Sequence, residues 1–216
     1  MNYKKLLALV LITATTPAFA SNFTVDFEKT WDYANGDINN YYNGGAAADL
    51  STGGPNLGVS FVNVSGLSND SLSTYYSNAP SMQGVAYAHD TAYMNVAAGV
   101  VNLSFWYSSL SDVTGAVTAW SGINGTGTLL GSFDLTANNS GATWDTWNSV
   151  VFSYTGRAKS FDFSGSANVA AFDNISTVPT PAAALLYGTG LAMFGAIRLS
   201  ARLRSERKAD SGQLIL

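Results

Sequence analysis

The chain has 216 residues, with 10 Lys and Arg, 14 Asp and Glu, a single His and no Cys. The absence of cysteine excludes disulfides, thiolate metal sites and cysteine nucleophiles. Residues 21–177 hold three basic residues against twelve acidic ones, and this net charge of −9 excludes charge-driven binding to nucleic acids or anionic lipids.

The first twenty residues have the pattern of a secretory signal peptide. A lysine pair forms the charged start, residues 6–12 form a short apolar core, and Ala18-Phe19-Ala20 is a small-x-small cleavage site. We therefore predict that the export machinery and signal peptidase process this segment, with cleavage between Ala20 and Ser21. The alternative is a buried N-terminal helix.

The segment from 21 to 177 is predicted to be all-β. Short alternating or β-branched runs recur in it, separated by clusters of Gly, Asn and Ser, and no long stretch has the 3.6-residue apolar period of a helix. We expect one domain, a jelly-roll-like β-sandwich of eight or nine short strands. The expected strands lie at residues 23–28, 57–64, 101–107, 116–120, 128–135, 150–154, 161–163 and 169–175.

Two long loops, at residues 30–55 and 66–82, interrupt these strands. Loops of this length in a compact domain are usually functional or disordered. They contain aromatic residues, and a flat ring with a polar handle suits an amphipathic ligand such as a sugar. The alternative is that the rings cover the ends of the sandwich or fill the edge of its core. The predicted sugar contacts are Trp31, Tyr41, Tyr42, Tyr75 and Tyr76.

Carboxylates are the other chemical candidates. Asp26 and Glu28 are two residues apart on the first expected strand and so share one face. Asp173 lies near the end of the last strand, on the face of Ala171 and Ile175, where a buried carboxylate needs compensation. If the first and last strands are neighbours, Glu28 and Asp173 can bind a structural Ca²⁺. The alternative is that Asp173 hydrogen-bonds a loop while Asp26 and Glu28 face water.

The same carboxylates leave a secreted glycoside hydrolase, or another carboxylate-dependent hydrolase, as an alternative function, since glycosidases need two carboxyl groups at a fixed separation. The neighbours of His89 do not suggest a catalytic triad. Asp32, Asn35, Asp37 and Asn39 have the spacing of a calcium loop but lack its bidentate glutamate, so we interpret them as a solvated loop. We predict no catalytic residue.

The C-terminal segment has the pattern of a membrane helix with a basic tail. Pro181 suits the first turn of a helix, and Thr180 can cap it. Residues 182–197 carry no charge and span roughly 24 Å as a helix. Because Arg198 can snorkel, we place a transmembrane helix at about residues 182–199, in preference to an amphipathic core helix. The basic cluster that stays cytoplasmic by the positive-inside rule is Arg198, Arg202, Arg204, Arg207 and Lys208.

Together these features resemble the PEP-CTERM proteins, which are bacterial exported proteins with a C-terminal sorting signal. The motif is Val178-Pro179-Thr180-Pro181, followed by the apolar helix and the arginine cluster. Residues 116–131 and 158–175 also resemble sequences common in this family. The family's usual tripeptide is Pro-Glu-Pro, so Thr180 stands where a glutamate is expected.

The resemblance implies that exosortase, a transpeptidase-like enzyme of the membrane, recognises and cuts the C-terminal segment. We divide the chain into a signal peptide (1–20), an ectodomain outside the inner membrane (21–177), a sorting signal (178–208) and a tail (209–216). We expect a non-enzymatic cell-surface or biofilm-matrix protein whose partner is extracellular polysaccharide. A membrane-anchored protein that keeps its helix is the alternative to processing.

Overall fold

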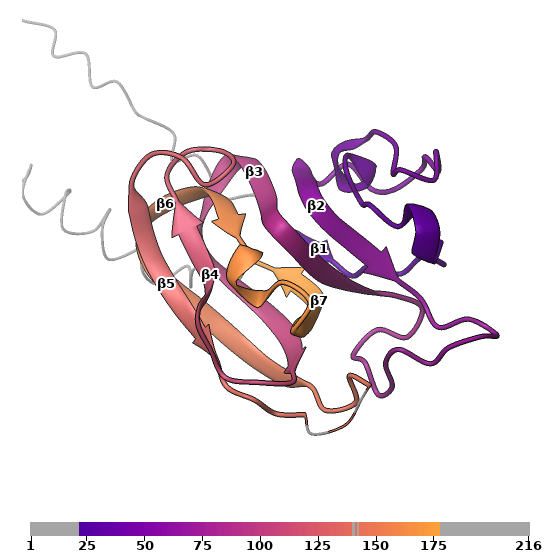
Figure 1. The fold of residues 1–216 in the computed structure, drawn as a ribbon. Coiled ribbons are helices and arrows are strands. Elements are labelled where there is room, and N and C mark those ends of the chain that lie inside the picture. The colour runs from indigo at the N-terminus through magenta and orange to yellow at the C-terminus, as the bar shows by residue number, and fades with distance from the viewer. Residues whose placement is uncertain (1–21, 140, 142, 178–216) are drawn as a thin grey trace, which may run out of the picture. The chain divides into compact units, whose positions relative to one another are not determined.

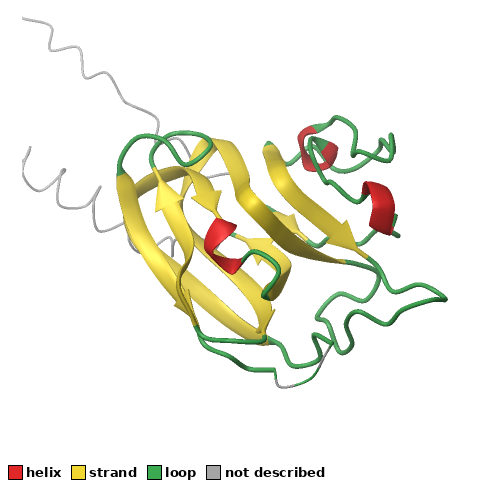
Figure 2. Cartoon of the chain, in the orientation of Figure 1, coloured by secondary structure: helices red, strands yellow, loops and turns green. Residues whose placement is uncertain are grey.

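The computed structural model describes residues 22–139, 141 and 143–177, and Figures 1 and 2 show their fold. By its internal contacts the chain divides after Thr177, and the second unit, 178–216, lies outside the described residues. So do the predicted signal peptide with its cleavage site, the Val178–Pro181 motif, the transmembrane helix and the basic cluster. Within the described part, no helix is long and apolar enough to cross a membrane.

The described residues form an all-β fold, as the sequence predicts. Seven antiparallel strands make one sheet in the order β1-β7-β3-β6-β4-β5, with β2 paired to β3. The helical elements of this part are three short 3₁₀ turns. The strands are β1 (Thr24–Val25), β2 (Val59–Leu67), β3 (Val85–Ser109), β4 (Val113–Trp120), β5 (Leu129–Leu135), β6 (Asn148–Asp162) and β7 (Ala170–Ser176), and the turns are η1 (Tyr33–Asn35), η2 (Tyr41–Asn43) and η3 (Ser164–Ser166).

Two strands are longer than the sequence suggests. β3 contains the predicted strand 101–107 and also residues 85–100, which were not among the expected strands, while β6 joins two predicted strands into one. Both strands contain a glycine with positive φ, Gly99 at 68° and Gly156 at 102°. Glycine adopts this conformation without the penalty that a side chain adds, so the strand bends there and continues. The described residues therefore form seven strands, fewer than the eight or nine expected.

The sheet curls, as Figure 1 shows, and the larger of two clusters of buried hydrophobic side chains lies between its two halves. Phe133 of β5 lies 5.7 Å from Phe105 of β3 and 5.6 Å from Phe152 of β6, measured between ring centroids. In the sheet, β5 pairs with β4, so these contacts cross the core. Phe105 also packs against Phe172 of β7 at 5.6 Å. Burial of these rings is the main stabilising contribution of the fold.

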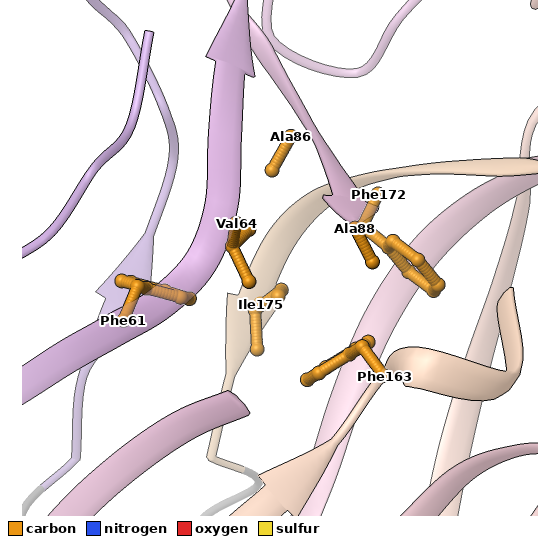
Figure 3. Close-up of a pocket in the computed structure, with 7 residues that line it drawn as sticks. All are labelled: Phe61, Val64, Ala86, Ala88, Phe163, Phe172 and Ile175. Carbon is orange, nitrogen blue, oxygen red and sulfur yellow. The ribbon is translucent and has the colours of Figure 1, made fainter. Parts of the chain in front are cut away.

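A small gap remains inside this core (Figure 3). Its volume is about 10 Å³, at the lower limit for one water molecule, and its apolar wall offers no hydrogen-bond partner. We therefore interpret it as imperfect packing and not as a ligand site. Its lining residues are Phe61, Val64, Ala86, Ala88, Phe163, Phe172 and Ile175.

The first and last strands pair with each other. β1 lies antiparallel to β7, with Val25 opposite Ile175. The backbone N–H of Phe23 donates to Thr177 Oγ1, and the N–H of Thr177 donates to the carbonyl of Phe23. Because both ends and the core between them lie within residues 22–177, this segment, called the β-domain below, is a self-contained folding unit. The carboxylate hypothesis depends on the first and last strands being neighbours, and this prediction is confirmed.

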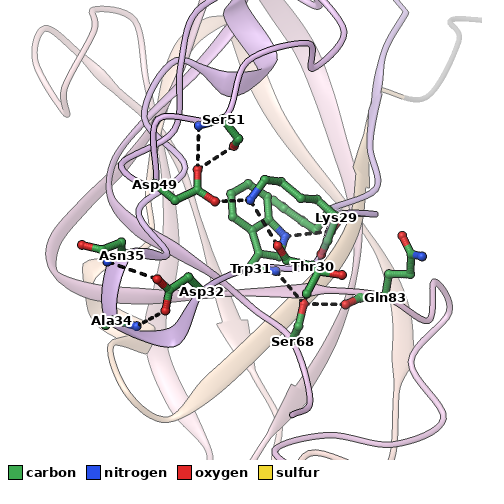
Figure 4. A network of polar contacts seen from close by, with 11 residues as sticks. Lys29, Thr30, Trp31, Asp32, Ala34, Asn35, Asp49, Ser51, Ser68 and Gln83 are labelled. Carbon is green, nitrogen blue, oxygen red and sulfur yellow. Dashed lines mark hydrogen bonds and ion pairs between the residues drawn. The ribbon is translucent and has the colours of Figure 1, made fainter.

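The predicted loop at 30–55 is anchored to the sheet by Trp31. The Trp31 ring is buried, and its backbone N–H donates to Ser68 Oγ at 2.9 Å (Figure 4). A Cβ at Gly66 would stand 2.1 Å from the Trp31 ring, and one at Gly84 would stand 2.7 Å from it. Both glycines therefore provide the space that the indole occupies.

Lys29 ties the same loop together. Its Nζ forms an ion pair with Asp49 and lies 4.4 Å from the centroid of the Trp31 ring (Figure 4). Burial raises the pKa of the Asp49 carboxyl, but hydrogen bonds from Lys29 and Ser51 outweigh this and lower it below its usual value. The charge of Lys29 is thus neutralised within the fold and is not offered to a ligand.

Candidate binding surface

Asp173 lies buried beneath the β2–β3 loop (residues 68–84). Its Oδ2 accepts a hydrogen bond from the backbone N–H of Ser81 at 2.8 Å. Its Oδ1 lies 2.6 Å from the Ser81 hydroxyl and accepts from the backbone N–H of Asn174 at 2.7 Å. The carboxyl group is fully buried, and these contacts occupy both of its oxygens. Asp173 therefore hydrogen-bonds a loop, which is the alternative to calcium binding that the sequence analysis left open.

Glu28, the second predicted calcium ligand, is exposed and accepts from the backbone N–H of Gln83 at 2.8 Å. Burial is the main cause that raises the pKa of Asp173 to about 6; the hydrogen bonds from Ser81 and Asn174 lower it, and the charge of Glu28 raises it further. A calcium ion between Glu28 and Asp173 would have to displace Ser81. Among residues 22–139, 141 and 143–177, no three His, Cys, Asp or Glu side chains gather into a group that could hold a metal. The calcium ion stays a prediction.

The burial of Asp173 also bears on the hydrolase alternative. A glycosidase carboxyl group must reach the bond that is cut, whereas Asp173 has no exposed surface. The carboxylate of Asp26 accepts from the Tyr42 hydroxyl at 3.4 Å and from the backbone N–H of Glu28 at 3.3 Å. In this structure, Asp173 is therefore in no position to act as proton donor or nucleophile.

The predicted sugar-contacting rings separate into two groups. Trp31, Tyr42 and Tyr76 are 3%, 1% and 2% exposed, so they fill the edge of the core and present no face to a ligand. Filling the edge of the core is the alternative role that the sequence analysis gave for these rings. Tyr41 is half-buried against Trp31 and Tyr42. Tyr75 is half-exposed and, unlike the other four, stacks on an exposed ring.

Tyr75 belongs to an aromatic patch, which we define as Tyr33, Tyr75, Tyr87 and Trp144. Tyr33, in η1, is 62% exposed and stacks on Tyr75 with ring centroids 5.5 Å apart and planes 2° apart. Tyr87 of β3 lies 6.4 Å from Trp144, with an interplanar angle of 29°. Burial is the main cause that raises the pKa of Tyr87; the Ser65 side chain lowers it, and Tyr33, Asp37 and Tyr75 raise it further.

Backbone pairing between two loops positions the patch. The β2–β3 loop (68–84) runs beside the β5–β6 loop (136–147), where the backbone N–H of Trp144 donates to the carbonyl of Tyr75. The backbone N–H of Ser77 in turn donates to the carbonyl of Trp144. Residues distant in the sequence therefore present their rings side by side.

An open hollow lies beside Tyr75 and Trp144. Its volume is about 360 Å³, which is within the range of small-ligand sites. Flat rings and hydroxyl groups share its wall, a combination that fits the apolar face and the polar rim of a sugar ring. The lining residues are Ser73, Thr74, Tyr75, Leu110, Thr143 and Trp144.

A group of three polar side chains lies next to the patch, where His89 contacts Tyr87 with ring centroids 4.9 Å apart. The Ser65 hydroxyl lies 2.6 Å from Asp37 Oδ1 and 2.9 Å from His89 Nε2. A carboxylate only accepts, so Ser65 donates its hydrogen to Asp37 and His89 donates Nε2–H to Ser65. In a catalytic triad, histidine stands between the other two and takes the proton of serine. Here serine stands in the middle, so this arrangement does not activate a nucleophile.

The sequence analysis did not assign Tyr87, Trp144 or His89 to the candidate site; Tyr33 is one of the aromatic residues of the first long loop but was not among the predicted sugar contacts. One available signal was the alternation along residues 85–89, in which the alanines point into the core and Tyr87 and His89 lie on the other face. The stacking of Tyr33 on Tyr75 has no such signal, because it joins two loops without periodicity.

Comparisons with known proteins do not assign the chain to a family. No family model matches it, and no curated protein does. Among solved structures, it is similar to a glycoside hydrolase family 43 arabinoxylan arabinofuranohydrolase from Bacillus subtilis in complex with cellotetraose. The identity is 14% and the TM-score 0.33, over 45% of this chain and 21% of that chain. A similarity this weak carries no argument about function.

Proposed function

We propose that the β-domain is a non-enzymatic carbohydrate-binding module that binds its ligand through the aromatic patch. The stack of Tyr33 on Tyr75 is the observation that carries this proposal. Tyr33 is 62% exposed, so its stacking leaves a large ring face open to solvent. A ring already held in place loses little conformational freedom when a ligand stacks on it, which favours binding.

The charge of the β-domain favours a neutral glycan over an acidic one. Its net charge of −9 repels polyanions. Asp37 beside the patch adds a negative charge, and Lys29 is paired with Asp49. Arg157 donates to the backbone carbonyls of Ala98 and Gly99 at the bend of β3. Recognition therefore depends on stacking and hydroxyl contacts.

A glycan array run beside a hydrolysis assay, both on residues 22–177, tests this function. We expect binding to neutral oligosaccharides without release of new reducing ends. Turnover that disappears in Asp26→Asn would support the secreted hydrolase instead. Absence of both binding and turnover would contradict carbohydrate recognition and leave a structural role in the matrix.

We further propose that this module, as a jelly-roll-like β-sandwich, is exported and sorted to the cell surface or matrix. The support is the sequence alone: the signal peptide, the Val178–Pro181 motif, the apolar segment and the basic cluster. Mass spectrometry of the mature protein tests the sorting step. We expect a C-terminus near Thr180, whereas a mature chain that still ends at Leu216 would contradict cleavage.

A further inference from the structure

Tyr33 and Tyr75 place two oxidisable rings face to face at the surface of the β-domain. Their ring centroids are 5.5 Å apart and their planes differ by 2°. Tyr33 is 62% exposed and Tyr75 is half-exposed, so a soluble oxidant reaches both rings. The two residues belong to different loops, so a bond between them would join segments that are distant in the sequence.

Ordered backbone on both sides keeps these two rings together. Tyr33 begins η1, a turn whose start is capped by the side chain of Asp32. The backbone N–H of Tyr75 donates to Asn69 Oδ1 at 2.8 Å, and its carbonyl accepts from the backbone N–H of Trp144 at 3.0 Å. The contact between the rings is therefore set by the fold and does not depend on a chance encounter of two free loops.

Tyr41 and Tyr42, the other pair of contacting tyrosine rings in the described part of the chain, have a different geometry. Their centroids are 5.1 Å apart, but their planes stand at 85° and Tyr42 is 1% exposed. The ring of Tyr42 also packs against Phe27 and Phe61, so it has no room to turn toward its neighbour. Proximity, exposure and freedom to turn are combined in the exposed stack.

The composition of the chain leaves tyrosine radicals without a thiol to intercept them. A cysteine thiolate is a preferred target of oxidants, and the chain contains no cysteine. A tyrosine that loses one electron and its hydroxyl proton becomes a phenoxyl radical. The unpaired electron of this radical is shared with the Cε atoms of the ring, so two such radicals in contact combine through these carbons.

We propose that Tyr33 and Tyr75 are a site of oxidative cross-linking, at which a peroxidase joins the two rings into dityrosine. Each phenol gives up one electron and its hydroxyl proton, and a bond then forms between one Cε atom of each ring. The hydrogens on these two carbons leave as protons, and two protons return to the phenolic oxygens. The two electrons and the two remaining protons reduce one hydrogen peroxide, whose O–O bond breaks to give two water molecules.

The new bond staples the first long loop to the β2–β3 loop. It joins the rings at their edges, so the stacked rings must turn, which their exposed position on loops permits. A covalent link restricts the unfolded chain between Tyr33 and Tyr75 and thereby stabilises the folded state, as a disulfide does. This staple does not depend on carbohydrate binding.

Treatment of residues 22–177 with a haem peroxidase and hydrogen peroxide tests the site. Mass spectrometry after proteolysis is expected to find one linked pair of peptides, which contain Tyr33 and Tyr75 and together lack two hydrogen atoms. We expect the protein to gain dityrosine fluorescence and to remain a monomer in denaturing electrophoresis. Its unfolding midpoint is expected to rise by about 5 °C or more.

Phenylalanine variants separate the chemistry from the stacking. Tyr33→Phe and Tyr75→Phe each keep the ring but remove the hydroxyl, so we expect the linked peptides, the fluorescence and the rise in the unfolding midpoint to disappear. Tyr41→Phe is the matched control, because it removes a hydroxyl from the other tyrosine pair, and it is expected to keep all three.

Three results would overturn the proposal. The first is the absence of dityrosine under conditions that couple free tyrosine in the same buffer. The second is a product whose links join other tyrosines or two protein molecules. The third is a linked product that persists in Tyr33→Phe. A correct link without a rise in the unfolding midpoint would overturn the stabilising role of the staple.

Discussion

At the scale of single residues, Asp173 has the largest consequence for the behaviour of the β-domain in solution. It is fully buried, and its pKa is raised from 3.8 to about 6. The folded state therefore binds the proton more tightly than the unfolded chain does. Linkage then requires the stabilising contribution of this proton to be complete below pH 3.8 and to disappear as the pH rises through about 6.

We expect Asp173→Asn to change how stability depends on pH. Relative to this variant, the unmodified β-domain is expected to lose about 3 kcal/mol of unfolding free energy between the acidic limit and neutral pH. Urea unfolding across this pH range measures the difference in unfolding free energy between the two proteins. The contributions of the other carboxylates are the same in both proteins and cancel in this difference. Parallel pH profiles for the two proteins would contradict the burial of an ionisable Asp173.

Lys29 gives a second prediction at this scale. Lys29→Met keeps the apolar stem over Trp31 but leaves the partly buried Asp49 without its cation. We expect a loss of about 1–2 kcal/mol in unfolding free energy, measured by urea unfolding. Lys159→Met removes an exposed lysine from β6 and is the matched control, with an expected change within about 0.5 kcal/mol. Equal effects of the two substitutions would exclude a structural role for the Lys29 pair.

At the scale of the elements, periodicity predicts the strands but not their ends. The runs at 116–120, 128–135 and 169–175 correspond to β4, β5 and β7. The extent of β3 and β6 was not predictable, because Gly99 and Gly156 resemble strand breakers in the sequence. They act as bends because tertiary pairing continues on both sides of each glycine.

The candidate site was less predictable than the strands. Alternation does not apply in loops, so nothing in the sequence separates the buried rings of Trp31, Tyr42 and Tyr76 from the accessible ring of Tyr33. That separation depends on how the loops pack, which local pattern does not encode. The chemical class of the site, aromatic rings with polar neighbours, was nevertheless recognisable from composition.

The packing of the first long loop on the sheet gives a prediction for Gly66. Gly66→Ala is expected to destabilise the β-domain by about 2–3 kcal/mol, since its Cβ would stand 2.1 Å from the Trp31 ring and displace it. Thermal unfolding checks this. Gly141→Ala is the control, because a Cβ there has ordinary contacts at 3.6 Å or more. A Gly66→Ala variant as stable as the control would show that Trp31 does not anchor the loop.

At the scale of the whole molecule, the β-domain combines a closed core with an accessible aromatic patch. Its ends meet in the β1–β7 pair, so it needs neither disulfides nor a further segment to complete the core. Its negative charge argues against acidic ligands. The patch, assembled from η1, β3 and two loops, is therefore the part of the described surface that we assign to recognition.

Calorimetric titration of residues 22–177 with a neutral glycan identified on the array tests this account most directly. We expect Tyr33→Ala and Tyr75→Ala each to weaken binding about tenfold or more, as loss of a stacked ring does. Leu129→Ala, which removes a comparably exposed apolar side chain from β5, is expected to leave the affinity unchanged. If the two tyrosine variants bind as tightly as the unmodified β-domain, the aromatic patch is not the carbohydrate site.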